Sequence, residues 1–480
     1  MSKPALHIYL NSNVRSDDVG PCLLLEGETS LQVKGEVDFI YKFRTFLDDL
    51  SHLKYLDRLS FHLPARLSSD EKKRMQSYAN LGKEIAIEVK ESLGGFEDSL
   101  LGIRNIFSNI NTIIEKPDLS QLRVKPGFSA VVISAGPSLE NEFSVLQEIQ
   151  NKALLVCVDA SFRRLLKENI KPHIVVSTER NKEGLLFFSD LPPNLETLLL
   201  GQPTIPPEIY EYYNGPKACV FKYTGPFMWF PFSRPMFWAA SSSAHLAYRV
   251  ACHLGASSVA LVGQDLCYHS ETFQSHANLL AYPDWAAKNT AKKRLSDNKG
   301  FFVKGNTFEK VMTNPVWDSF SMDFSYLARE TKIPTFNTSV FGREIGGIDF
   351  RPLQAWVGQQ NLRQLECCFP VENKNASRER TLFESKTFDA IRSLQALQEE
   401  MKQKRADEEI ARLYSQILGR PHFLELVMEL VISDYANCES QCFAYPKNSI
   451  RYQRDFLQKV SPALEAVLKL LSQSSKKNRE

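Results

Sequence analysis

Short apolar runs alternate with longer polar or helix-forming segments between Phe128 and Asp265. The runs are rich in valine, isoleucine and leucine, which is typical of strands that are buried on both faces of a sheet. Helical or loop segments between them indicate a largely parallel sheet with right-handed crossovers. The pattern predicts strands at 130–133, 154–158, 174–176, 197–200, 218–221 and 259–262.

Small, polar or charged residues follow almost every one of these runs. In parallel sheets, ligands bind beyond the carboxyl ends of the strands, so these residues are the first place to look for a site. The segments are Ser134–Ser138, Asp159–Ser161, Ser177–Asn181, Gly201–Gln202, Tyr223–Gly225 and Gly263–Asp265.

The first of these segments, Ser134–Ser138, connects a strand to a helical pattern that begins at Leu139. Gly136 would let a phosphate approach the backbone, and Pro137 suits the first turn of a helix. One glycine is not a GxGxxG motif, and the lysine of a Walker motif is missing. A strand-to-helix turn without a ligand therefore remains an equal alternative.

One further strand end and one helix start carry carboxyl or hydroxyl groups. Asp159 either caps the predicted helix 162–169 or faces a ribose or base. Ser241–Ser243 opens a helix with one apolar stripe, which Gly255 closes. Capping accounts for one serine, and the other hydroxyls are candidates for contact with a phosphate at the positive end of the helix.

The loop after the last strand contains Gln264, Asp265, Tyr268, His269 and His276. An acid at a strand end with two nearby histidines supplies the parts for general base catalysis, because imidazole titrates near neutral pH. A structural role is the alternative for each histidine. The spacing of the two histidines is not a recognised metal-ligand spacing, so no metal is expected.

The aromatic and proline-rich segment Pro226–Pro235 is either a lid or acceptor-binding loop, or a buried crossover. Residues 302–306 and 335–338 resemble further strand ends.

The flanks differ from this central region. Residues 1–115 read as a small α/β domain, with strands at 7–10 and 22–25 and a helix at 38–56, and serve as a scaffold or docking surface. Amphipathic helical periodicity continues from Glu379 to the C-terminus. The expected fold class is α/β: a Rossmann-like central domain (116–355) between an N-terminal α/β domain (1–115) and a C-terminal helical domain (356–480).

The amino-acid composition limits the classes of binding partner that we expect. The 480 residues carry 58 basic and 56 acidic side chains, a net charge of +2, so no bulk field favours nucleic acid. The first residues lack the apolar core of a signal peptide, and no apolar run approaches the ~20 residues of a membrane span. Nine cysteines without CxxC spacing fit reduced thiols. The sequence predicts a cytoplasmic protein that binds neither membrane nor nucleic acid.

Five ordered segments of the chain resemble the domain shared by motility-associated factor (Maf) flagellin glycosyltransferases. They are SAGPSL at 134–139, VCVDASFRRLLKENIKPHIVVSTER at 156–180, SSSAHLAYRVACHLGASSVALVGQDLCYHSETFQSHA at 241–277, VKGNTFEKVMT at 303–313 and IPTFNTSVFGREIGGI at 333–348. The likeness covers roughly residues 110–350. The same domain is similar to archaeal hydroxymethylpterin pyrophosphokinases, which lack the flanking domains, so the flanks favour the Maf type.

The resemblance implies transfer of a nonulosonic acid, pseudaminic or legionaminic, from its CMP-activated form to Ser or Thr hydroxyls of flagellin, in the cytoplasm before export. It also implies a fold similar to that of bacterial sialyltransferases. CMP has one phosphate and leaves readily, so a divalent metal is less necessary than for UDP sugars. No cofactor is expected besides the CMP-sugar donor.

The resemblance also implies roles for individual residues. His276 is the expected base that deprotonates the acceptor hydroxyl, His269 is the alternative, and Asp265 lines the donor site with Gln264. The residues expected to contact the nucleotide or the donor sugar are Gly136, Pro137, Ser138, Asp159, Glu179, Ser242, Ser243, Gln264, Tyr268, Asn306 and Asn337.

The chain departs from the family pattern at two of these places, and the region after Gly305 also lacks a glycine that the family pattern leads us to expect. The first turn lacks a second glycine, and Glu179 stands where relatives often have an aspartate, so its ribose contact has a different reach. Two other function classes stay open: a pterin pyrophosphokinase that uses ATP, and a non-catalytic binding protein on the same fold.

Overall fold

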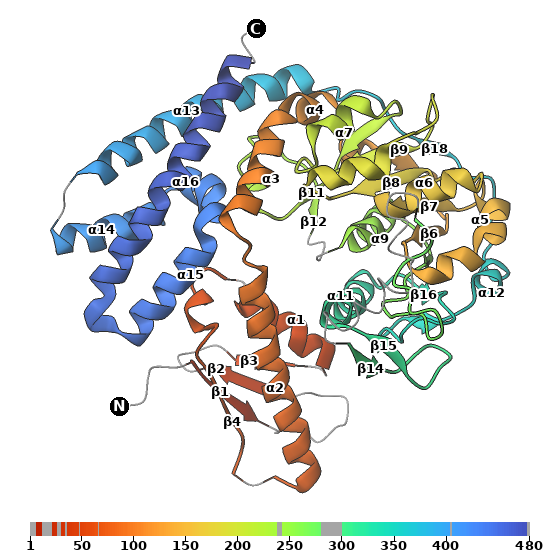
Figure 1. Cartoon of the computed structure of the whole chain (residues 1–480), viewed down its shortest axis with the longest axis horizontal. Coiled ribbons are helices and arrows are strands. Elements are labelled where there is room, and N and C mark those ends of the chain that lie inside the picture. The colour runs from red at the N-terminus through yellow and green to blue at the C-terminus, as the bar shows by residue number, and fades with distance from the viewer. Residues whose placement is uncertain are drawn as a thin grey trace. The chain divides into compact units, whose positions relative to one another are not determined.

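The apolar runs of the central region form one parallel sheet of eight strands in the computed structural model (Figure 1). The structure describes residues 6–11, 22–25, 30–33, 36–47, 49–65, 67–237, 242–279, 300–403 and 406–477. These divide into two compact units. One comprises Leu101–Tyr223 and Pro231–Phe383, and the other Met1–Leu100, Thr224–Phe230 and Glu384–Glu480. The three domain ranges expected from the sequence remain a prediction.

The sheet of the first unit has the order β10-β9-β8-β7-β6-β13-β16-β17, with every neighbouring pair parallel. From β6 the chain adds strands outward in one direction as far as β10, then returns to add β13 on the other side of β6. The strands are β6 (Ala130–Ile133), β7 (Leu154–Val158), β8 (Ile174–Ser177), β9 (Leu198–Gly201), β10 (Lys217–Cys219), β13 (Val259–Val262), β16 (Thr335–Asn337) and β17 (Asp349–Phe350).

The expected strands are confirmed, three of them with identical bounds (β6, β7 and β13). The fold class expected from the sequence, a Rossmann-like α/β domain, is confirmed as well. The run expected at 218–221 is divided between β10 and β11 (Phe221–Lys222), and β11 pairs with β12 (Met236–Phe237) outside the main sheet. Every residue of β6, β7, β8, β9 and β13 is buried, which explains their uninterrupted apolar sequences.

Helices cover this sheet and position its polar edge. α9 packs on β6, β7 and β8, while α6 packs on β7 and β8. α9 begins where Ser242 caps it and ends before Gly255, whose φ of +95° is the left-handed conformation typical of a helix stop. The helices are α4 (Ile110–Glu115), α5 (Phe143–Ile149), α6 (Asp159–Lys167), α7 (Pro207–Tyr212), α9 (Ser243–His253), α11 (Pro315–Thr331), α12 (Leu353–Val357) and the part of α3 (Phe96–Ser108) from Leu101 onward.

Two small antiparallel ladders complete the first unit. β14 (Phe301–Val303) pairs with β15 (Val311–Thr313), and β5 (Arg123–Val124) pairs with β18 (Cys367–Cys368). The strand ends expected at 302–306 and 335–338 therefore coincide with β14 and β16.

The second unit contains a four-stranded sheet in the order β3-β2-β1-β4, in which only the β1–β4 pair is parallel. Its strands are β1 (Leu6–Asn11), β2 (Cys22–Leu25), β3 (Ser30–Gln32) and β4 (Leu59–His62). The helix expected at 38–56 was wrong at its end: α1 spans Glu36–Leu47, and Leu53–Tyr55 forms a separate 3₁₀ turn.

Helices make up most of the rest of the second unit, and those from Glu384 onward follow the helical periodicity of the sequence. The long ones are α2 (Ser69–Ser92), α13 (Ala376–Lys402, from Glu384 onward), α14 (Asp407–Ile417), α15 (Met428–Ala444) and α16 (Ser449–Lys477), and α8 (Gly225–Met228) is a single short turn. The aromatic segment 226–235 contributes buried Phe227, Trp229 and Phe230 to this unit, and the Trp229 Nε1–H donates to His422 Nδ1 at 3.2 Å. Burial of these rings supports the crossover alternative over a lid.

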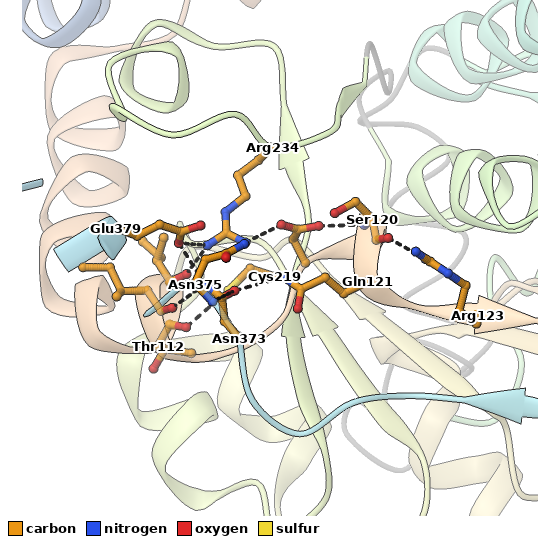
Figure 2. Close-up of polar contacts among 12 residues, drawn as sticks. Thr112, Ser120, Gln121, Arg123, Cys219, Arg234, Asn373, Asn375 and Glu379 are labelled. Carbon is orange, nitrogen blue, oxygen red and sulfur yellow. Dashed lines mark hydrogen bonds and ion pairs between the residues drawn. The ribbon is translucent and has the colours of Figure 1, made fainter. Parts of the chain in front are cut away.

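A buried arginine joins three distant segments of the first unit. Figure 2 shows the Arg234 guanidinium donating to Glu379. The guanidinium also donates to the carboxylate of Asp118, and the three side chains are at most 9% exposed. Asn373 Nδ2 donates to Glu379 at 2.8 Å and to the Ile114 carbonyl at 2.8 Å. Burial nevertheless raises the pKa of Glu379 by more than Arg234 lowers it. The network ties segments around 118, 234 and 379 together at a large desolvation cost.

We predict that Arg234→Ala destabilises the protein strongly, because it leaves two buried carboxylates without their cation. Removing one partner of a buried ion pair costs about 3–5 kcal/mol of unfolding free energy. Arg163→Ala is the matched control, since its partner Asp190 has an 85% exposed side chain and such pairs contribute at most about 1 kcal/mol. Urea unfolding of both variants checks this, and equal midpoints would contradict it.

Candidate active site

A cavity of about 200 Å³ lies at the carboxyl edge of the eight-stranded sheet. β6 and β13 are neighbours there, and the chain leaves them in opposite directions, which makes this the topological switch point where ligands bind in open α/β sheets. The walls come from three strand ends and from α9 and α11. They include Ser134–Gly136, Asp159–Ala160, Ser242–Ala244, Gly263–Gln264, Ser275–His276, Trp317 and Phe320.

Gly136 and Gly263 let the turns after β6 and β13 touch. The Gly136 N–H donates to the Gly263 carbonyl at 2.8 Å. A Cβ on Gly136 would lie 2.1 Å from Asp265 Oδ2, and Gly263 has a φ of +65°. Gly136 is thus required by the close approach of Asp265. Pro137 begins a 3₁₀ turn, Pro137–Asn141, so α5 starts only at Phe143, later than the sequence indicates.

Asp265 lies behind the cavity wall. Its Oδ2 accepts from the Ser138 hydroxyl at 2.9 Å and from the Ser138 N–H at 3.3 Å, and Ser138 also bonds Ser339. Burial raises the pKa of Asp265 to about 6. Burial, with Asp265 nearby, raises the pKa of Glu142 to about 7. No sequence signal singles out Glu142, because this residue does not directly follow a strand.

Asp159 lines the cavity and is the first residue of α6. Its two oxygens accept from the Ser177 hydroxyl at 2.8 Å and from the Ala160 N–H at 2.9 Å. Burial, with a smaller contribution from the charge of Glu179, raises its pKa to about 6, although the hydrogen bonds from Ser177 and Ala160 act in the opposite direction. Glu179 itself accepts from the Asn181 N–H at 3.0 Å and is outside the cavity lining. Asp159 is therefore held rigidly as an acceptor facing the cavity.

The start of α9 supplies two hydroxyls. Ser242 caps the helix in a reciprocal arrangement with His245, whose Nδ1 lies 2.8 Å from Ser242 Oγ. Ser243 Oγ lies 2.7 Å from Thr178 Oγ1, while Ser241 lies outside the described residues. Burial lowers the pKa of His245 to about 3, so this imidazole stays neutral. α9 therefore presents a neutral, hydroxyl-lined N-terminus to the cavity.

The loop after β13 separates the two candidate histidines. His276 lines the cavity, with its Nδ1 2.9 Å from Ser275 Oγ. His269 instead packs against Phe341, and its Nδ1 accepts from the N–H groups of Glu271 and Thr272. Those bonds give His269 a role in shaping the loop. Its position in the cavity makes His276 a better candidate than His269 for the catalytic base.

The remaining candidates support the walls. Gln264 lines the cavity and accepts from the Ser134 hydroxyl at 2.6 Å. Tyr268 is buried against Trp317, and Asn314 Nδ2 donates to its hydroxyl at 3.3 Å. Asn306 and Asn337 both fix the loop at Ser339: the Asn306 amide donates to the Ser339 carbonyl, and Asn337 Oδ1 accepts from the Ser339 N–H.

The structure thus brings together six of the residues expected from the sequence: Gly136, Asp159, Ser242, Ser243, Gln264 and His276. Trp317 and Phe320 were missed. Asn314 caps α11 and Pro315 occupies its first turn, a helix-start signal in the sequence that places Trp317 and Phe320 on one face at i, i+3.

Comparisons with known proteins agree with this architecture. Residues 104–271 match the model of the 6-hydroxymethylpterin diphosphokinase MptE-like family. The structure is similar to that of the Maf glycosyltransferase from Magnetospirillum magneticum AMB-1, with a TM-score of 0.52 and 14% identity, over 93% of this chain and 68% of that one. The resemblance to the Maf family is confirmed at the level of the fold. Curated proteins give no match to this chain.

Among the residues that the structure describes, no three His, Cys, Asp or Glu side chains gather as they would around a metal ion. No helix in the described ranges is both long and apolar enough to cross a membrane.

We predict that Gly136→Ala disrupts the site, because the added Cβ collides with Asp265 and with the Gly263 carbonyl. Such overpacking costs about 1–3 kcal/mol of unfolding free energy. Gly358→Ala is the control, since its Cβ would make only ordinary contacts at 3.7 Å. Thermal melting compares the two variants, and a melting temperature for Gly136→Ala as high as that of Gly358→Ala would refute the steric argument.

We predict that Asp265→Asn stabilises the protein more at pH 8 than at pH 4.5. The pKa of Asp265 rises from 3.8 to about 6 on folding, so the folded state binds the proton more tightly and stability falls as pH rises through this window. Asparagine mimics the protonated carboxyl, and its carbonyl still accepts from Ser138. Melting temperatures at both pH values test this; a constant difference between variant and wild type would contradict it.

Proposed function

We propose that this protein is a glycosyltransferase that moves a nonulosonic acid, pseudaminic or legionaminic, from its CMP-activated form to a Ser or Thr hydroxyl of flagellin. The cavity at the switch point carries the proposal, because it combines a helix N-terminus, a fixed carboxylate and a histidine. The likeness in fold to a Maf glycosyltransferase supports the same reading. The reaction would take place in the cytoplasm, before flagellin is exported.

The donor nucleotide fits the walls of the cavity. The first turn of α9, with Ser242 and Ser243, offers backbone N–H groups and hydroxyls to the single phosphate of CMP. Asp159, with a pKa of about 6, is mostly ionised at neutral pH and can accept from a ribose hydroxyl. Gln264 and the backbone at Gly136 complete the donor side.

His276 is the proposed base. The acceptor oxygen forms a bond to the anomeric carbon while the bond from that carbon to the phosphate oxygen breaks, and the acceptor proton passes to the imidazole. The reaction inverts the anomeric centre, and CMP leaves with the electron pair. The charge that develops on the phosphate is stabilised by the N-terminus of α9. Ser275 orients the imidazole ring through Nδ1.

A pyrophosphokinase that uses ATP is the second candidate. The match of residues 104–271 to the 6-hydroxymethylpterin diphosphokinase MptE-like family favours it. This reaction would require ATP with Mg²⁺, and it gives no role to the helices that follow Glu384. A binding protein without catalysis is the third alternative.

We predict that CMP raises the melting temperature of the purified protein and that ATP with Mg²⁺ does not, because a ligand that binds only the folded state stabilises it. A shift with ATP and Mg²⁺ alone would favour the pyrophosphokinase. A shift with neither would favour the binding protein.

The same proposal predicts that His276→Ala lowers turnover by about 10²–10⁴-fold, the usual contribution of a general base, while the CMP-induced shift in melting temperature is retained. Mass spectrometry of flagellin after incubation with the CMP-sugar measures turnover. His269→Ala is the matched control, because this histidine lies outside the cavity. Equal loss of turnover and CMP binding in His276→Ala would remove the base assignment, and a larger loss in His269→Ala would transfer it.

A further inference from the structure

A second cavity lies at the opposite edge of the eight-stranded sheet from the candidate active site. Its volume is about 460 Å³, against about 200 Å³ for the candidate site. Its walls are the residues just before β6, the turn before β7 and the chain between α12 and β18. They comprise Lys125–Ser129, Lys152 and Asn361–Glu366. Because β6 and β7 begin here, we call it the amino-edge cavity.

Hydrogen bonds hold the walls of the amino-edge cavity in place. The Leu365 N–H donates to the Asn151 carbonyl at 2.9 Å, and Ser129 Oγ donates to Gln360 Oε1 at 2.9 Å. The pairing of β18 with β5 lies directly beyond the first of these bonds. The segment 361–366 is therefore held near both of its ends. A cavity built in this way needs little ordering of the chain when a ligand binds.

The charged side chains around the amino-edge cavity leave a surplus of positive charge. Lys125, Lys152 and Arg363 line it, and Glu366 is the only carboxylate among the lining residues. Glu366 pairs with Lys125, whose Nζ lies 2.7 Å from Glu366 Oε1. Neither Lys152 nor Arg363 takes part in an ion pair with another residue that the structure describes. Two such cations on one cavity favour a ligand with two negative charges.

The rest of the lining suits a phosphate group and the body of a small organic molecule. The N–H groups of Gly127 and Phe128 donate to no acceptor in the described part of the chain, and successive backbone N–H groups are suited to anions. A Cβ on Gly127 would meet no atom within 4 Å, so the backbone there is open to an approaching group. Leu362 and Leu365 add apolar surface. The volume of about 460 Å³ is within the range of ~300–1,000 Å³ that is usual for small-molecule sites.

We propose that the amino-edge cavity binds a phosphate monoester, with Lys152 and Arg363 as the cations that hold the phosphate. A phosphate monoester carries about −1.5 to −2 charges at pH 7, which matches these two cations. The guanidinium of Arg363 can donate two parallel hydrogen bonds to phosphate oxygens, and the ammonium of Lys152 acts as a point charge. The site is independent of the proposed glycosyl transfer, because it lies at the other edge of the sheet. A sugar phosphate and a nucleoside monophosphate share this chemistry.

Calorimetry of the full chain with glucose 6-phosphate, AMP and glucose tests the proposal and separates the two sources of the phosphate. Each titration is done without CMP and with CMP, so that the candidate active site is occupied in the second case. We expect at least one of the two esters to bind equally in both cases, and glucose not to bind. The sulfate ester that corresponds to the preferred ligand is a monoanion and should bind about tenfold more weakly.

Variants of the charged lining assign the site to these residues. Lys152→Gln and Arg363→Gln should each weaken binding of the preferred ester by about tenfold, because each loses a hydrogen bond to a charged group. Glu366→Gln should tighten binding, because it removes a negative charge from the lining and releases Lys125 from its ion pair. A lining with only a structural role would not respond in opposite directions to these changes.

Lys310→Gln and Arg329→Gln are the matched controls. Both residues are exposed cations of the first unit that lie outside the cavity lining, and Lys152 and Arg363 are exposed as well. The control variants should leave the affinity unchanged. All four glutamine variants should keep the melting temperature of the wild-type protein, because exposed substitutions of this kind change stability little.

Equal weakening in the control variants would mean that the esters bind to surface charge in general, and would overturn the inference. Loss of binding when CMP is added would place the ester in the candidate active site and overturn it too. The same conclusion follows if Lys152→Gln and Arg363→Gln both leave the affinity unchanged, if the sulfate ester binds as tightly as the phosphate, or if wild-type protein binds neither ester. The CMP-induced shift in melting temperature tests the proposed function separately.

Discussion

The contact between the two turns that follow β6 and β13 is the constraint on which the candidate site depends. Ser134 and Gly136 donate backbone hydrogen bonds to Val262 and Gly263, and side chains add the Ser134–Gln264 bond. Neither glycine tolerates a Cβ without a collision with the opposite turn. Because these hydrogen bonds hold the two turns together, the backbone at this edge of the sheet has a defined position, and the cavity between α9 and α11 is built on it.

A second constraint acts at a distance from the cavity. The Arg234 network replaces apolar packing with buried charge where three segments far apart in the sequence meet (Figure 2). A buried ion pair of this kind contributes little net stability compared with apolar residues of the same volume, but it penalises every arrangement in which one partner is missing. The network therefore favours one arrangement of the chain over others, because it holds the segment at Glu379 to the loop at Asp118.

The sequence was sufficient for the sheet because burial on both faces leaves a simple signal. Runs such as Leu154–Val158 contain no polar residue, and their ends coincide with the observed strand ends. The sequence was insufficient where tertiary contacts determine which side chains line the cavity. From the sequence, Asp265 and His276 are equally good candidates for contact with a ligand. In the structure only His276 lines the cavity, because Asp265 packs closely against Gly136 behind the cavity wall. Trp317 lies on α11, which begins at Pro315, outside the region from Phe128 to Asp265 in which the alternating pattern predicts strands.

Burial changes proton binding by the carboxyl groups along the polar edge of the sheet. On the side of β6 and β13, Asp265 and Glu142 lie close together, and both bind protons more tightly than free carboxyls do. At the end of β7, burial likewise raises the pKa of Asp159 to about 6. A carboxyl that holds a proton carries no charge, so these buried groups repel an anion less than three ionised carboxylates would.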